Sequence, residues 1–122
     1  MIAPGDVVPR RDTTAELYVT VLSGEAHIQA GTGRLITCPF IPGRLGLGAM
    51  ALVVAVEQPH GVLLPELVQW LPSSAFDEPI GNIGMAALHE ATSIIAALLQ
   101  PWRTAAISAV ADVSITISPA TG

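Results

Sequence analysis

The segment of residues 34–43, Arg-Leu-Ile-Thr-Cys-Pro-Phe-Ile-Pro-Gly, constrains the fold of this chain more than any other stretch. It is apolar and rich in strand-favouring residues, a Gly-Thr-Gly turn signal precedes it, and Pro-Gly closes it. Alternation along a strand places Ile36, Cys38 and Phe40 on one wholly apolar face, which requires a core. Pro39 has no N–H to donate, so this end of the strand is expected at an edge, a bulge or a barrel rim.

Weaker signals of the same kind extend along the chain. Four further strands are expected, over residues 5–8, 16–22, 50–56 and 62–70, with residues 23–33 as a polar loop. The spacing of apolar residues then changes to that of a helix. Asn82 is a candidate N-cap, and the apolar positions after it recur at helical spacing until Gln100-Pro101. Five strands followed by one helix predict a mainly β fold, a small barrel or sandwich with the C-terminal helix packed across it.

The composition indicates a partner. The chain is 51% hydrophobic and 12% charged, against roughly a quarter charged in an average soluble domain. A monomer of this composition would expose large apolar patches, so we expect a homodimer or a permanent partner. The longest charge-free stretches, residues 45–56 and 91–102, are shorter than the about 18 residues that a membrane span needs. The N-terminus has no basic region followed by an apolar one, so the expected compartment is the cytoplasm.

The charge is unevenly distributed. The net charge is −5, and every basic residue is an arginine. Residues 1–44 balance four arginines against four carboxylates, whereas residues 45–122 carry the whole negative charge. A general nucleic-acid binder presents a basic face, because phosphate neutralisation supplies most of its affinity. This chain could offer only a small basic patch, built from its N-terminal arginines.

The cysteine and the histidines predict no metal site and no cofactor. Cys38, His27, His60 and His89 are scattered singly, without the spacings that metal ligands show. One cysteine excludes a disulfide framework. Because Cys38 lies on the apolar face of its strand, we expect a buried, inert thiol.

Two adjacent arginines are the strongest candidates for chemistry. Arg10 and Arg11 lie in a short loop beside the hydroxyls of Thr13 and Thr14. Two guanidinium groups there could hold a phosphodiester bidentately and stabilise charge that develops on it. The alternative is a solvated loop in which the arginines pair with nearby carboxylates, namely Asp6, Asp12 or Glu16.

The order of these signals resembles the MazF-type toxins of the MazF/PemK/CcdB superfamily, the toxin halves of bacterial toxin–antitoxin pairs. The similar segments are Gly5-Asp6-Val7 at the start, Tyr18-Val-Thr-Val-Leu-Ser23 in the second strand, Cys38-Pro-Phe-Ile41 at the end of the third, and then Val62-Leu-Leu-Pro-Glu-Leu-Val-Gln69, Pro79-Ile-Gly-Asn82 and the final helix. The resemblance covers residues 1–99, which we take as the toxin domain, and leaves residues 100–122 as a tail of unknown structure.

The resemblance implies an SH3-like barrel, a homodimer, a protein antitoxin that wraps the dimer, and sequence-specific cleavage of single-stranded RNA without a metal. In typical members an Arg before the second strand and a Thr or Ser at the end of the third carry the chemistry. Here Leu17 and Ile41 occupy those positions. We therefore expect Arg10 or Arg11 to stabilise the phosphate and Thr37 to supply a hydroxyl. Further RNA contacts are expected from the other cations and hydroxyls near the N-terminus, namely Thr13, Thr14, Arg34 and Arg44.

Other functions are open to the same fold. One is a catalytically inactive protein that retains antitoxin binding. Another is a DNA gyrase inhibitor like the CcdB branch, in which a C-terminal Trp engages gyrase, and Trp102 is the corresponding candidate. A third is a degenerate, inactive copy with an appended tail after Leu99.

Overall fold

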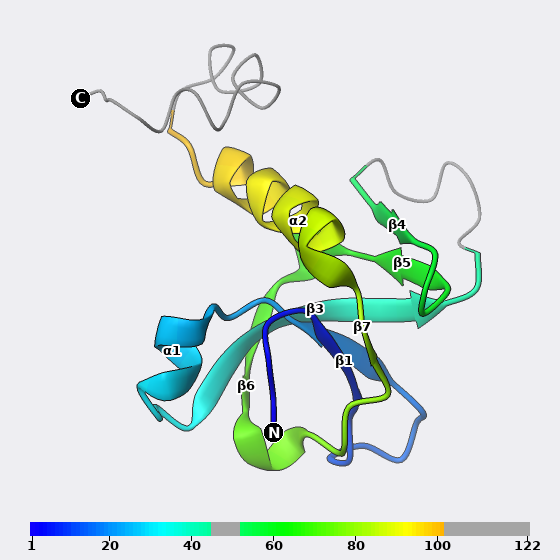
Figure 1. The fold of residues 1–122 in the computed structure, drawn as a ribbon, viewed down its shortest axis with the longest axis vertical. Helices are drawn as coiled ribbons and strands as arrows, with labels where there is room; N and C mark the ends of the chain where they lie inside the picture. Colours follow the sequence, from blue (N-terminus) through cyan, green and yellow to red (C-terminus); the bar gives the residue numbers. More distant parts are fainter. Residues whose placement is uncertain (45–51, 102–122) are drawn as a thin grey trace.

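The architecture is known from a computed structural model, which describes residues 1–44 and 52–101. Within them, seven strands form one antiparallel sheet that curls into a half-barrel, and a long C-terminal helix crosses it (Figure 1). This confirms the predicted fold class, mainly β with one C-terminal helix. The elements in chain order are β1 (Asp6–Pro9), β2 (Tyr18–Val21), α1 (Glu25–Gln29), β3 (Arg34–Pro42), β4 (Val54–Val56), β5 (Gly61–Leu63), β6 (Gln69–Pro72), β7 (Gly81–Asn82) and α2 (Gly84–Leu98), with single 3₁₀ turns η1 (Pro65–Leu67) and η2 (Ser73–Ala75).

Strand β3 is the centre of the sheet, and Pro39 marks the point where it changes partner. One side of β3 pairs with β2, while the other side pairs first with β6, through Thr37, and then with β5, from Phe40 onward. The carbonyl of Pro39 accepts a hydrogen bond from Leu64 N at 3.1 Å, so its backbone nitrogen faces this second side. The missing N–H therefore lies at the junction between two partner strands, which confirms that pairing is interrupted there.

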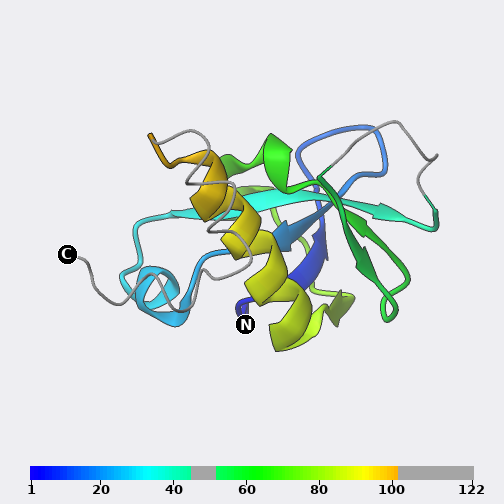
Figure 2. The ribbon, with the colours of Figure 1, turned by 90° about the horizontal axis from the view of Figure 1, so that it is seen from above.

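Two apolar cores lie on the two faces of the sheet. The first core is enclosed between the sheet and α2, which contributes Leu88 and Ala91 (Figure 2). As expected, Cys38 and Phe40 from β3 lie in this core, and Ile36 packs against it. The second core lies on the opposite face, and its buried members are Val8, Val19, Val21, Leu35, Leu71, Ala75 and Phe76. Both faces of the central strands are thus covered, which explains their near-continuous apolar sequence.

Cys38 is the buried thiol that its strand position predicted. Its side chain is fully buried, and burial raises the pKa of this thiol to about 12. At neutral pH the group is protonated and shielded, so it is neither a nucleophile nor a metal ligand in the folded chain.

Several predicted boundaries were wrong. The polar loop at residues 23–33 contains the short helix α1, which His27 anchors with its Nδ1 2.7 Å from Ser23 Oγ. The expected strand over residues 62–70 is two strands, because the turn η1, which begins at Pro65, separates them. Helix α2 begins at Gly84, two residues after the predicted cap.

Asn82 nevertheless stabilises the start of α2. Its Oδ1 accepts a hydrogen bond from Gly84 N at 2.8 Å, and its Nδ2 donates to Asp6 Oδ1 at 2.9 Å. The other carboxylate oxygen of Asp6 accepts from Ala3 N at 2.8 Å. Asp6 is therefore used to join the N-terminus to the helix, and it does not pair with the arginines of the neighbouring loop.

Candidate functional site

A groove opens where β1, β2 and β3 end together, and it is the candidate functional site. Its volume is about 330 Å³, which is the size of a small ligand pocket. We call it the strand-end groove, and its lining residues are Arg10, Glu16, Leu17, Tyr18, Val19, Pro39, Phe40, Ile41, Pro42 and Gln69.

The register of the sheet places Arg10 beside the two positions that carry chemistry in MazF-type toxins. The backbone N–H of Arg10 donates to the carbonyl of Leu17 at 2.9 Å, so these residues are cross-strand neighbours. Tyr18 pairs with Phe40, and the next residues outward along the two chains are Leu17 and Ile41. Directly opposed residues share a face of the sheet, so Arg10, Leu17 and Ile41 form one row across the groove.

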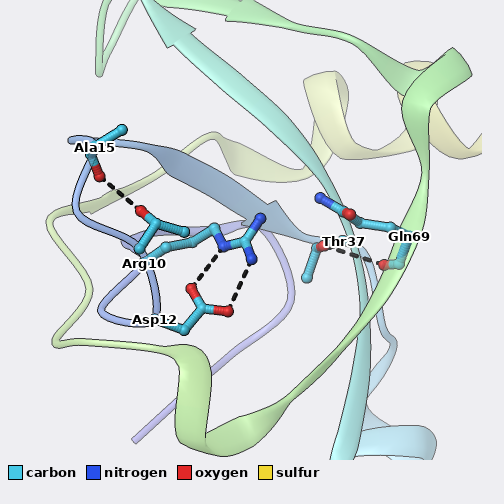
Figure 3. A network of polar contacts seen from close by, with 6 residues as sticks. Arg10, Asp12, Ala15, Thr37 and Gln69 are labelled. Atoms are coloured by element: carbon cyan, nitrogen blue, oxygen red, sulfur yellow. Dashed lines mark hydrogen bonds and ion pairs between the residues drawn. The ribbon is translucent and has the colours of Figure 1, made fainter.

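Arg10 is held by an ion pair with Asp12. Its Nε donates to Asp12 Oδ1 at 2.9 Å and one of its terminal nitrogens donates to Asp12 Oδ2 at 2.8 Å, a bidentate arrangement (Figure 3). The hydrogen bond to Asp12 raises the pKa of Arg10, and the same bond lowers the pKa of Asp12. The Arg10 side chain is 17% exposed, so the cation faces both its partner and the groove. Of the three carboxylates considered as partners, Asp12 is the one that pairs.

The lowered pKa of Asp12 determines how pH acts on this pair. A carboxyl whose pKa falls on folding adds stability above its ordinary value of 3.8, and that contribution is lost only as the pH falls through the lowered value. Asp12 therefore stays charged at neutral pH, and its pair with Arg10 is retained there.

The remaining groove is mostly apolar. Leu17 is 44% exposed and Ile41 is half-buried, and neither side chain can donate to a phosphate or transfer a proton. At the rim, the hydroxyl of Tyr18 donates to Glu16 Oε2 at 3.0 Å, and this bond raises the pKa of Tyr18. Strand alternation directs Glu16 and Tyr18 away from the row that contains Arg10.

Thr37 lies next to the groove, but the structure does not bring it into the groove. Its side chain is fully buried, and its hydroxyl donates to the carbonyl of Gln69 at 3.1 Å (Figure 3). The sequence placed Thr37 correctly on the face of Pro39, but its side chain is buried and its hydroxyl is bonded to the backbone of β6, which pairs alongside β3 at this position. In this geometry Thr37 positions the backbone of Gln69 and does not face a substrate.

The other predicted site residues lie outside the groove lining. Arg11 points elsewhere, because its Nε donates to the carbonyl of Phe76 at 3.0 Å. Thr13 donates its hydroxyl to Ala15 O at 2.7 Å within the loop, and Thr14 is exposed. The last two, Arg34 at the start of β3 and Arg44, are exposed.

Gln69 is the groove residue that the sequence analysis missed. It lies in residues 62–70, an apolar run whose pattern predicts one continuous strand and gives a single glutamine no distinct role. Pro65 is the sequence signal that could have placed Gln69 in the groove. A strand that breaks at this proline allows the residues after it to pair with a different part of β3.

The described ranges, 1–44 and 52–101, contain no cluster of three or more His, Cys, Asp or Glu side chains that could hold a metal ion. In the same ranges, no helix has the length and apolar character needed to cross a membrane. Trp102, on which the gyrase hypothesis rests, lies outside the described residues, as does nearly all of the predicted tail.

Comparison with known proteins identifies close relatives. A family model described as "Type II toxin-antitoxin system toxin Rv0299" matches residues 5–98. Toxin Rv0299 of Mycobacterium tuberculosis (strain ATCC 25618 / H37Rv) is 64% identical over 99 residues, which are 81% of this chain and 99% of that protein.

Solved structures share the fold at much lower identity. A chain of MazE-MazF (Form-III) from Deinococcus radiodurans superposes with a TM-score of 0.64 at 21% identity, covering 80% of this chain and 95% of that one. An endoribonuclease from a mycobacterial species superposes with a TM-score of 0.64 at 15% identity, covering 84% and 95%. The half-barrel with its C-terminal helix is therefore a MazF-like fold, as the motifs implied.

Proposed function

Because this chain belongs to the Rv0299 family of type II toxin–antitoxin toxins, we propose that it acts by cleaving single-stranded RNA in the strand-end groove, without a metal. One observation carries this proposal. Arg10 is the cross-strand neighbour of Leu17, the position where MazF-type toxins have their arginine. A guanidinium therefore lies in the same part of the groove, on the residue that follows the adjacent strand β1.

Arg10 is suited to stabilise a phosphodiester in the transition state. A guanidinium presents five N–H donors, so the pair with Asp12 leaves donors available for the non-bridging phosphate oxygens. Negative charge on these oxygens grows as the 2′-hydroxyl gives its proton to water and attacks phosphorus, and as the bond to the 5′-oxygen breaks and that oxygen takes a proton from water. In this scheme Thr37 is a positioning residue, since its hydroxyl holds the backbone of Gln69 at the edge of the groove.

The direct test is incubation of purified, antitoxin-free protein with single-stranded RNAs of varied sequence, at enzyme excess and in EDTA. Attack by the 2′-hydroxyl predicts fragments with 2′,3′-cyclic phosphate and 5′-hydroxyl ends. Intact RNA of every sequence would reject the proposal. A substrate with a 2′-deoxyribose at each cleaved position is the matched control, because it lacks the nucleophile.

Asp12 limits the activity in this scheme, because its carboxylate holds one bidentate edge of the Arg10 guanidinium and its negative charge repels a phosphate that approaches the remaining donors. We expect Asp12→Asn to tighten RNA binding about two- to fivefold, in line with the small gain of exposed ion pairs. Asp77→Asn is the control, since Asp77 is exposed and its carboxylate accepts from the Glu78 N–H, not from Arg10. Fluorescence anisotropy with a labelled oligonucleotide measures both. An equal gain in the two variants would show that net charge, not release of Arg10, is responsible.

A second candidate is a toxin-fold protein that binds its antitoxin but does not cleave RNA. The apolar character of Leu17 and Ile41 favours it, because such walls suit side chains of a protein partner. A mycobacterial endoribonuclease with a similar fold, TM-score 0.59 at 13% identity, was solved in complex with its cognate antitoxin. This candidate predicts intact RNA in the assay above while a co-expressed antitoxin still co-purifies. Loss of co-purification on Leu17→Glu would place the antitoxin in the groove.

We also propose a homodimer, as the composition suggested. Apolar side chains are exposed on α2, where Met85 is 77% exposed, and on the segment from η1 to β6, where Leu67 and Trp70 are 48% and 57% exposed. Contact with a second copy would remove such side chains from water. Sedimentation equilibrium tests this, and a mass of 12.6 kDa at all concentrations would contradict it.

A further inference from the structure

The strand-end groove contains an unused hydrogen-bonding group at the end away from Arg10. Gln69 begins β6 directly opposite Thr37, and it is half-buried. Its backbone is held by the buried hydroxyl of Thr37 at 3.1 Å, so the position of its Cα is well defined. Among the described residues, its side-chain amide has no hydrogen-bond partner, although it lines the groove.

Arg10 and Gln69 face the same space from opposite sides. Figure 3 shows the Arg10 side chain extending from the β1 end and the Gln69 side chain extending toward it from β6, on either side of Thr37. The wall between them is apolar, formed by Leu17, Val19, Pro39 and Ile41. A cation, an apolar wall and a planar amide are the groups that a nucleotide needs for its phosphate, its base face and its base edge, respectively.

We propose that this groove receives one unpaired nucleobase, that Leu17 and Ile41 pack against its face, and that the amide of Gln69 reads its hydrogen-bonding edge. An amide offers a donor and an acceptor in one plane, which allows bidentate pairing with a base edge. Only an unpaired base exposes its Watson–Crick edge, and the deep major groove of an RNA duplex hides the other edge from side chains, which accords with a single-stranded substrate. Gln69 is then a specificity-determining residue, and the inference rests on the proposed action on RNA.

This scheme gives a role to the apolar side chains at positions 17 and 41, where typical MazF-type toxins have an Arg and a Thr or Ser. Leu17 and Ile41 enlarge the apolar surface at the point where MazF-type toxins have polar groups, and base faces pack well on such a surface. Within residues 1–44 and 52–101, Arg10 is the one cation in the groove lining, and phosphate binding then depends on it. We therefore expect the groove to discriminate between bases while its salt dependence corresponds to about one phosphate contact, a slope near −0.7 for a single strand.

The test uses four short RNAs that differ only at a central nucleotide, each with a 2′-deoxyribose there to prevent cleavage. Fluorescence anisotropy compares the wild type with Gln69→Ala, Gln69→Glu, Arg10→Ala and the control Gln100→Ala, which changes an exposed glutamine after α2. We expect the wild type to prefer one base about 5- to 150-fold, since a bidentate pair discriminates by about 1–3 kcal/mol.

The variants separate the two roles. Gln69→Ala should bring the four affinities together, and Gln69→Glu, which keeps the size but loses the amide donors, should change their order. Arg10→Ala should weaken all four by a similar factor, and Gln100→Ala should match the wild type. Equal thermal melting of Gln69→Ala and Gln100→Ala would confirm that the fold is intact, because the Thr37 bond goes to the backbone.

The possible failures are distinguishable. If none of the four RNAs binds, the proposed action on RNA fails and the reading by Gln69 fails with it. If the wild type binds all four equally, or if its preference survives in both Gln69 variants, the assignment of Gln69 is wrong while the action on RNA stands.

Discussion

Replacing Arg10 with alanine is expected to lower the rate of RNA cleavage about 100- to 1,000-fold. Removing one well-placed donor that stabilises transition-state charge has this effect in other enzymes, and among the described residues Arg10 is the only arginine that lines the strand-end groove. Cleavage of a fluorescent single-stranded RNA under single-turnover conditions measures the loss. Arg10→Lys should recover only part of the rate, because an ammonium lacks the bidentate geometry of a guanidinium.

Arg11→Ala is the matched comparison, because it removes the same charge from the adjacent position. Arg11 donates to the carbonyl of Phe76 and points away from the groove, so we expect most of the activity to remain. The sequence left the choice between the two arginines open, and this pair of variants decides it. Equal losses in both would mean that net charge near the loop, and not the placement of Arg10, supports cleavage.

Gly61→Ala is expected to cause a large loss of stability. A Cβ at this position would lie 2.5 Å from Phe40 Cζ and 2.6 Å from the carbonyl oxygen of Ile41. Phe40 is 3% exposed in the first core and cannot move aside, and the other atom belongs to the backbone of β3. We expect overpacking to cost about 1–3 kcal/mol, which lowers Tm by about 4 °C or more in a domain of this size.

Gly24→Ala is the control for this variant. A Cβ at Gly24 meets nothing within 4 Å, and its φ of −79° suits any residue. Both variants reduce the freedom of the unfolded chain equally. Gly24 is the N-cap of α1, where alanine is less favourable than glycine, so the control can only lose stability at this cap and a still lower Tm of Gly61→Ala reports the clash. Because Phe40, Ile41 and Pro42 also line the groove, a folded Gly61→Ala protein should bind RNA more weakly than Gly24→Ala. Equal melting temperatures in the two variants would contradict the close packing of β5 against β3.

The fold class could be predicted because local patterns and packing requirements agree. The apolar face of Ile36, Cys38 and Phe40 requires a core, and the helix that the spacing after Asn82 predicts is the element that can cover this face. The boundaries were less predictable, because an isolated apolar run does not show where it changes partner. Residues 62–70 look continuous in sequence, yet β5 and β6 pair with different halves of β3.

The site was only partly predictable for a related reason. Arg10 could be named because two adjacent arginines beside hydroxyls are rare in a chain with so few charges. Its pairing with Asp12 was one of several options, since spacing alone allowed three carboxylates. Thr37 was placed on the correct face, but a position on a face becomes buried or exposed only when the chain packs, and here the side chain is buried with its hydroxyl bonded to the backbone of β6.

By itself, the sequence determined the central strand, the interruption at Pro39, the buried thiol and the C-terminal helix, because each follows from side-chain period or from a missing N–H. Only the tertiary structure decided that Arg10, Leu17 and Ile41 share one row, that Arg11 turns away and that Gln69 enters the groove. Those relations depend on register between strands that lie far apart in the chain. Register depends on which hydrophobic faces are buried together and on the turns that connect the strands, so the pattern of one strand taken alone does not show it.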